Sequence, residues 1–185
     1  MAQERTRKIV ITGVLGAIAC LLGYTHWGFI PWFGGISLTI MHVPVIIGAI
    51  LEGPLVGLAI GLIFGLFSML QAAIAPSGPA DTWFTNPLLA VLPRLFIGPL
   101  SWLAWGWLKR WAVVGLAAAG VVGSATNTVL VLGMIVVLGY APLPVIVGVA
   151  IANGIPEAVV SAVITVAVVA AWWQIPVGRR RGASI

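Results

Sequence analysis

The chain has 185 residues, of which 61% are hydrophobic and 7% charged; nine Lys/Arg and four Asp/Glu give a net charge of +5. A soluble domain normally has about 25% charged residues. So few charges cannot cover a solvated surface, which excludes a soluble globular protein and predicts one all-α integral membrane domain over residues 1–185. The basic residues flank apolar stretches, so they predict membrane orientation and no nucleic-acid partner.

Apolar stretches bounded by proline, glycine or charge define the expected membrane spans. A helix needs about 20 residues to cross a hydrocarbon core of about 30 Å. Six candidates meet or approach this length, at residues 8–24, 37–51, 54–75, 87–108, 111–138 and 143–173. The second is short, so it is expected to be tilted, broken or only partly embedded.

Lysine and arginine predict how these spans are oriented. They cluster at residues 5–8, 109–110 and 179–181, whereas the connections at 26–36, 76–86 and 139–142 contain none. An even number of spans brings the three clusters to one face, and an excess of Lys and Arg marks the cytoplasmic face. We therefore expect six transmembrane helices with both termini in the cytoplasm.

Aromatic residues gather in or beside the outer connections. Trp27, Trp32 and Trp83 lie there among phenylalanines, glycines and prolines. Tryptophan is enriched at membrane interfaces, so an interfacial belt is one interpretation. The other is that these loops cover an outward-facing small-molecule pocket, since aromatic side chains on flexible hinges suit a lid.

Two ionisable residues fall inside predicted spans. Arg94 follows Pro93, and Glu157 follows Pro156. A charge at membrane depth costs about 2.5–3.5 kcal/mol on insertion scales, so each group needs a partner. The two form an ion pair with each other, or they meet a polar substrate, and these alternatives stay open. The planar guanidinium of Arg94 suits a carboxylate because it donates two parallel hydrogen bonds.

Polar neutral residues extend this candidate substrate-binding site. Asn127 lies in the fifth span, and Asn153 lies one helical turn before Glu157 on the same face. Asn86 precedes the proline-interrupted fourth span, and His42 lies within the second. Interhelical hydrogen bonding is an alternative role for all of them.

The sequence offers little for catalysis. No cluster of His, Cys, Asp and Glu has metal-site spacing, and no phosphate-binding loop is present. The single cysteine, Cys20, excludes a disulfide framework. We therefore expect neither an enzyme nor a bound cofactor. Gly13 and Ala17, at a spacing of four in the first span, form a small-residue stripe for helix packing or for a partner protein.

Three ordered segments carry a family resemblance across nearly the whole chain. Residues 40–54 (IMHVPVIIGAILEGP), 85–94 (TNPLLAVLPR) and 123–133 (GSATNTVLVLG) resemble the substrate-binding S components of energy-coupling factor (ECF) vitamin transporters. The likeness is greatest to the group that includes pantothenate, folate and hydroxymethylpyrimidine-related S components.

The resemblance implies a six-helix protein of the bacterial cell membrane that binds a water-soluble vitamin near its outer face. It further implies a transmembrane coupling subunit and two cytosolic ATPase subunits as partners. Family members commonly dock through Ala-x-x-x-Ala in the first helix, where this chain has Gly13 and Ala17. Pantothenate is the first expectation for the vitamin, with folate, pyridoxine, cobalamin and hydroxymethylpyrimidine as alternatives. The rival from another class is a six-span channel or structural protein without saturable vitamin binding.

Overall fold

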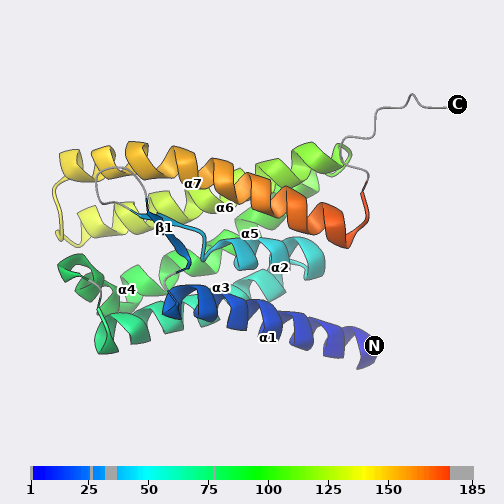
Figure 1. The fold of residues 1–185 in the computed structure, drawn as a ribbon, viewed down its shortest axis with the longest axis horizontal. Helices are drawn as coiled ribbons and strands as arrows, with labels where there is room; N and C mark the ends of the chain where they lie inside the picture. Colours follow the sequence, from blue (N-terminus) through cyan, green and yellow to red (C-terminus); the bar gives the residue numbers. More distant parts are fainter. Residues whose placement is uncertain (1, 26, 32–36, 77, 176–185) are drawn as a thin grey trace, which may run out of the picture.

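The computed structural model describes residues 2–25, 27–31, 37–76 and 78–175. These residues form an elongated helical bundle with a two-stranded hairpin against it (Figure 1). The helices are α1 (Ala2–Tyr24), α2 (Val43–Glu52), α3 (Pro54–Ile74), the 3-10 helix η2 (Pro79–Thr85), α4 (Pro87–Ala90), α5 (Leu92–Leu108), α6 (Ala112–Val137) and α7 (Leu143–Trp172). The antiparallel strands are β1 (Phe29–Pro31) and β2 (Ser37–Thr39), with Ile30 opposite Leu38.

Five helical segments are long and apolar enough to cross a membrane: Ala2–Tyr24, Pro54–Ile74, Pro87–Leu108, Ala112–Val137 and Leu143–Trp172. Their surfaces carry large exposed apolar side chains, such as Leu55, Val129 and Ile155, whereas Ser101, Ser161 and Thr165 are fully buried. This is the reverse of a soluble protein and follows from a lipid solvent, in which polar groups must find partners inside the bundle. The chain is a multi-pass membrane protein.

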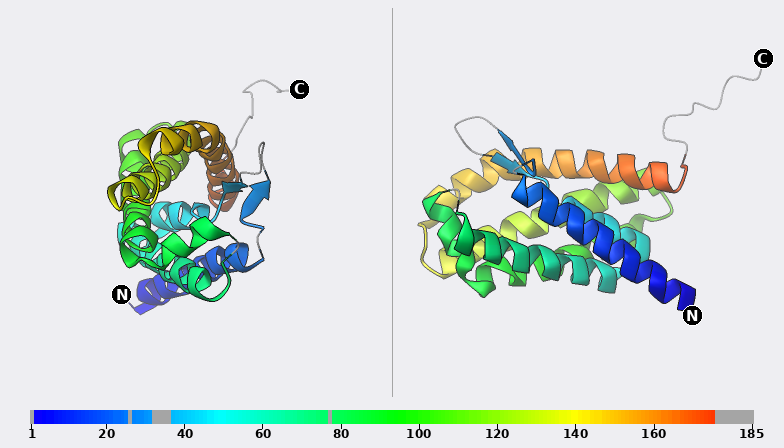
Figure 2. Two further views of the ribbon diagram at one scale, coloured as in Figure 1. Left: turned by 90° about the vertical axis from the view of Figure 1, so that its left-hand side faces the viewer. Right: turned by 60° about the horizontal axis from the view of Figure 1, so that its bottom comes forward.

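The predicted second span, residues 37–51, is not one continuous helix, in line with the expectation that this short span is tilted, broken or only partly embedded. Residues 37–39 form strand β2, and helix α2 has only ten residues, which is about 15 Å at 1.5 Å per residue. Every residue of α2 from Val43 to Ile50 is buried, and Figure 2 shows α2 (cyan) enclosed by the other helices. The predicted count of six full spans is therefore not confirmed: the described residues contain five long spans and one short enclosed helix.

Proline and glycine set the other helix boundaries. Gly53 adopts φ +99°, a conformation that glycine tolerates best, and Pro54 then begins α3 without needing a backbone donor. The predicted span 87–108 is interrupted at Val91, which separates α4 from α5 just before Pro93. This interruption directs the first turn of α5 toward the bundle interior, where Pro93 and Arg94 are buried.

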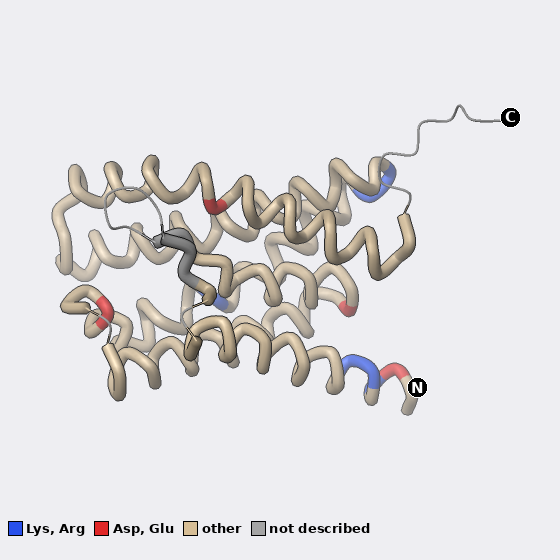
Figure 3. The backbone as a smooth tube through the Cα atoms, viewed as in Figure 1, with Lys and Arg blue, Asp and Glu red and all other residues tan. Residues whose placement is uncertain are grey.

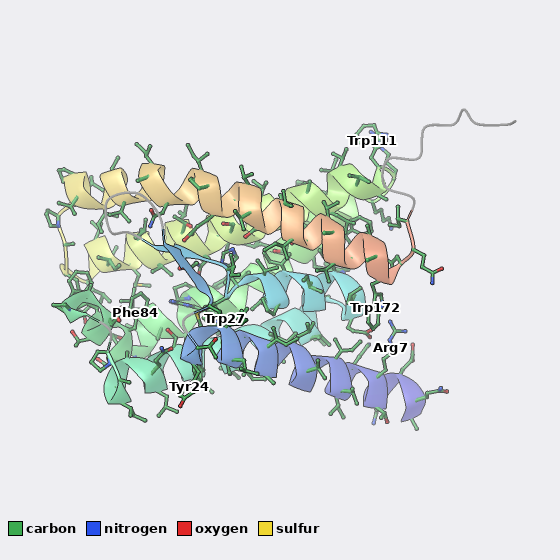
Figure 4. The ribbon with its side chains drawn as sticks, in the orientation of Figure 1. Arg7, Tyr24, Trp27, Phe84, Trp111 and Trp172 are labelled. Atoms are coloured by element: carbon green, nitrogen blue, oxygen red, sulfur yellow. The ribbon has the colours of Figure 1, made fainter. Side chains whose placement is uncertain are left out.

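The bundle has two chemically different ends. The N-terminal end of α1 and the α5–α6 junction carry Lys and Arg at the same end, as Figure 3 shows in blue. Arg7, Trp111 and Trp172 mark that end in Figure 4, and Phe84 lies at the opposite one. An ion pair of 2.6 Å between Arg7 Nη2 and Glu52 Oε1 joins the start of α1 to the end of α2 there.

Candidate substrate-binding site

A cavity of about 210 Å³ lies between α3, α5, α6 and α7, toward the end of the bundle that carries η2. A cavity of about 10–15 Å³ on the same measure of volume already holds one water molecule, so this volume suits a small organic molecule. The described residues that line it are Thr39, Met41, Phe64, Ser68, Gln71, Ala72, Ala75, Pro76, Asp81, Phe84, Arg94, Asn127, Thr128, Val131, Leu132, Val149, Asn153 and Glu157.

Arg94 enters this cavity from the first turn of α5. Its side chain is only 5% exposed, and its Nη1 donates a 2.5 Å hydrogen bond to the Leu89 carbonyl. The guanidinium carbon lies 5.0 Å from the centre of the Phe84 ring and 5.3 Å from that of Phe64. These aromatic faces attract the cation but accept no strong hydrogen bond. Arg94 Nε is buried and has no hydrogen-bond partner among the described residues.

Glu157 lies on another wall of the cavity, on α7. Its Oε1 accepts a 2.6 Å hydrogen bond from the Thr39 backbone N–H, and its Oε2 accepts one of 3.4 Å from the Thr128 hydroxyl. Both contacts are donors, which is what an ionised carboxylate requires. Glu157 therefore connects α7 to strand β2 and to α6.

Arg94 and Glu157 do not pair with each other. Their nitrogen and oxygen atoms lie farther apart than the 4.0 Å limit of an ion pair. The sequence left an ion pair and ligand binding as alternatives. The geometry removes the ion pair and places the two charges on separate walls of one cavity.

Two asparagines that the sequence analysis grouped with Arg94 and Glu157 also line the cavity. Asn127 projects from α6 and Asn153 from α7, one turn before Glu157. The Oδ1 atoms of both are buried without a hydrogen-bond partner among the described residues. Buried amide groups in this state can hydrogen-bond a ligand, because leaving them unpaired costs about 1–3 kcal/mol each.

The other predicted site residues are placed elsewhere. His42 is fully buried and shares a 2.7 Å hydrogen bond between its Nε2 and Ser161 Oγ. Asn86 caps α4 by accepting the Leu88 N–H at 3.0 Å. Trp83 stacks on Tyr140 with ring centres 5.5 Å apart. None of these three is among the lining residues, and Trp32 lies outside the described residues.

Sequence reasoning missed two polar residues of α3. Ser68 and Gln71 line the cavity, and Gln71 Nε2 also donates to the Gly23 carbonyl of α1 at 3.2 Å. A signal for them existed: they are the two polar side chains of Pro54–Ile74, and a spacing of three puts them on one helix face. Thr39 and Met41 had no comparable signal, because strand β2 and the turn that follows it bring them to the cavity.

The small residues of α1 divide between two faces. Gly16, Ala19 and Gly23 are buried, and a Cβ on Gly16 would lie 2.9 Å from Ile63 Cδ1. Gly13 and Ala17 are exposed, and a Cβ on Gly13 would meet no atom within 4 Å. The Gly13/Ala17 stripe therefore faces outward, whereas the Gly16 stripe packs against α3.

The helical bundle encloses a small polar cavity lined by one cation, Arg94, and two carboxylates, Asp81 and Glu157. This is the architecture of a solute-binding transport protein. The family model of the ECF transporter substrate-specific component matches residues 7–169. The chain belongs to this family, and it is a transport subunit of the membrane.

Two relatives have been named for their substrate. The pantothenate transporter PanT of Leuconostoc mesenteroides is 32% identical over 149 residues, which cover 76% of this chain and 72% of that protein. The pantothenic acid transporter PanT of Lactococcus lactis subsp. cremoris is 29% identical over 190 residues, which cover 92% of this chain and 96% of that protein.

Proposed function

We propose that this chain is the substrate-binding subunit of an ATP-driven ECF transporter for pantothenate in a bacterial cell membrane. The observation that carries the proposal is the buried Arg94 guanidinium, which lines a small cavity and forms no ion pair with Glu157. A cation at membrane depth is costly unless it meets a partner, so the cavity favours an anionic ligand. Pantothenate supplies a single carboxylate.

The remaining chemistry of pantothenate also matches the lining. Its amide and two hydroxyls can exchange hydrogen bonds with Asn127, Asn153 and Glu157, and its geminal methyl groups suit the apolar side chains of Val131 and Val149. Pyridoxine and hydroxymethylpyrimidine lack the carboxylate that Arg94 favours. The names of the two relatives support the same choice.

Titration calorimetry of the purified chain tests this proposal. We expect saturable binding of pantothenate, without ATP, and weaker or undetectable heats with folate, pyridoxine, cobalamin and hydroxymethylpyrimidine. Binding without ATP is expected because the sequence has no phosphate-binding loop. Preferential binding of another vitamin would contradict the choice of pantothenate. Folded protein that binds none of the five would favour the channel or structural alternative.

The orientation is part of the proposal: both termini are cytoplasmic and the cavity end faces outward. Its support is the gathering of Lys and Arg at one end of the bundle. A thiol at position 78 tests it, because a Cβ on Gly78 would meet no atom within 4 Å. In a Cys20→Ala background, Gly78→Cys is expected to react with an impermeant maleimide added outside intact cells. Reaction from the cytoplasmic side alone would reverse the orientation.

Energy is proposed to come from partner subunits, a transmembrane coupling subunit and two cytosolic ATPases. The exposed Gly13/Ala17 stripe of α1 is proposed as the docking surface, since small residues allow another helix to approach closely.

A further inference from the structure

Arg94 and Glu157, two of the three charged residues that line the cavity, have different neighbours. Arg94 is flanked by the rings of Phe64 on α3 and Phe84 on η2, whereas Glu157 is bonded to Thr39 on β2 and Thr128 on α6. Since they form no ion pair, a bound ligand can meet Arg94 at one end and Glu157 at the other. The cavity therefore offers a ligand the Arg94 cation on one side and the Glu157 carboxylate on the other.

The Glu157 wall accepts hydrogen bonds. A carboxylate has about four lone-pair positions, and the two described donors to Glu157 occupy one on each oxygen. Asn153, one turn earlier on α7, adds a buried Oδ1 without a described partner. A ligand hydroxyl suits this wall because its O–H can donate, whereas an anion would face the Glu157 charge at close range.

We propose that Glu157 is a specificity-determining residue that accepts a hydrogen bond from a hydroxyl at the end of the ligand remote from its carboxylate, and thereby rejects ligands with a second anionic group at that end. This inference rests on the proposed function. For pantothenate the relevant group is the terminal hydroxyl. Its phosphate ester loses the O–H donor and carries about −1.5 to −2 additional charge at pH 7.

Binding of two defined ligands tests this assignment. Pantothenate and 4′-phosphopantothenate are titrated into wild-type protein, and the selectivity is the ratio of their affinities. Like charges brought together in a buried interface are strongly unfavourable. We expect the wild type to prefer pantothenate by at least about a hundredfold, equivalent to about 2.7 kcal/mol.

Glu157→Gln removes the charge and keeps an oxygen that can accept the Thr39 N–H. It is expected to reduce the selectivity by about tenfold or more, through a gain for the phosphate ester. Glu52→Gln is the matched control: Glu52 is also a carboxylate, but it pairs with Arg7 at the opposite end of the bundle and does not line the cavity. This variant is expected to preserve the selectivity.

Asn153→Asp gives an independent test that does not alter Glu157. It adds a second carboxylate one helical turn away and is expected to widen the selectivity. Monodisperse elution and cooperative melting establish folding for each variant.

Similar wild-type affinities for both ligands, or an unchanged selectivity in folded Glu157→Gln or Asn153→Asp protein, would overturn the role of Glu157. An equal loss of selectivity in Glu52→Gln would also overturn it, because the effect would not be specific to the Glu157 wall. Failure of the wild type to bind pantothenate would overturn the proposed function and this inference together. Pantothenate binding with unchanged selectivity would overturn the inference alone.

Discussion

Replacing Arg94 with glutamine is expected to weaken pantothenate binding by tens-fold or more. Arg94 is 5% exposed, and its described polar contact is the Leu89 carbonyl, so the ligand carboxylate would be its ionic partner. Losing one partner of a buried charged hydrogen bond typically costs about 2–5 kcal/mol, and about 1.4 kcal/mol is a factor of ten in affinity. Titration calorimetry on wild type and Arg94→Gln measures the change.

A second ligand distinguishes the loss of a charge pair with the ligand from general damage to the binding site. Panthenol, the alcohol analogue of pantothenate, has no carboxylate, so its affinity should change far less in Arg94→Gln. Arg110→Gln is the matched protein control, because Arg110 lies over Trp111 at the opposite end of the bundle and should leave both ligands unaffected. Equal losses for pantothenate and panthenol would contradict a carboxylate contact at Arg94.

The double variant Arg94→Gln with Glu157→Gln distinguishes ligand binding from mutual charge compensation. If the two residues only neutralised each other, the double variant would recover both stability and pantothenate binding. Because they form no ion pair in the structure, we expect stability to respond additively and pantothenate binding to stay impaired. Recovery of pantothenate binding in the double variant would refute the carboxylate role of Arg94.

Tryptophan in the exposed Gly13/Ala17 stripe of α1 is expected to abolish pantothenate uptake but to preserve pantothenate binding. Ala17→Trp and Gly13→Trp place a large ring where a helix of the coupling subunit would approach, so van der Waals contact is lost. Neither position packs inside the bundle, so the isolated subunit should bind pantothenate normally. We expect complex formation to weaken by more than about tenfold, which is 1.4 kcal/mol.

Pull-down with the coupling module and uptake in proteoliposomes measure these effects on one preparation. Ile18→Trp is the matched control, because Ile18 is also exposed on α1 but lies away from the Gly13/Ala17 stripe. Proteoliposomes with this chain alone should show no concentrative uptake. Normal complexes with both stripe variants would move the docking surface elsewhere, and uptake by the chain alone would refute the need for partner ATPases.

The sequence by itself was sufficient for the class of protein and for most helix boundaries. Low charge and long apolar stretches required a lipid solvent, and the predicted spans 54–75, 111–138 and 143–173 agree closely with α3, α6 and α7. These features are local: hydropathy depends on consecutive residues, and glycine or proline ends a helix through its own backbone. Arg94 and Glu157 stood out for the same reason, since a charge in an apolar stretch is visible without knowing its neighbours.

Only the tertiary structure decided which of these residues meet. Whether Arg94 pairs with Glu157 depends on the relative depth and rotation of α5 and α7, which no local pattern contains. The same relations place His42 against Ser161, 119 positions away, and bring Thr39 to Glu157 across 118. The short α2 is buried because α1, α3, α5, α6 and α7 pack against it, whereas its hydropathy alone resembles that of a membrane span.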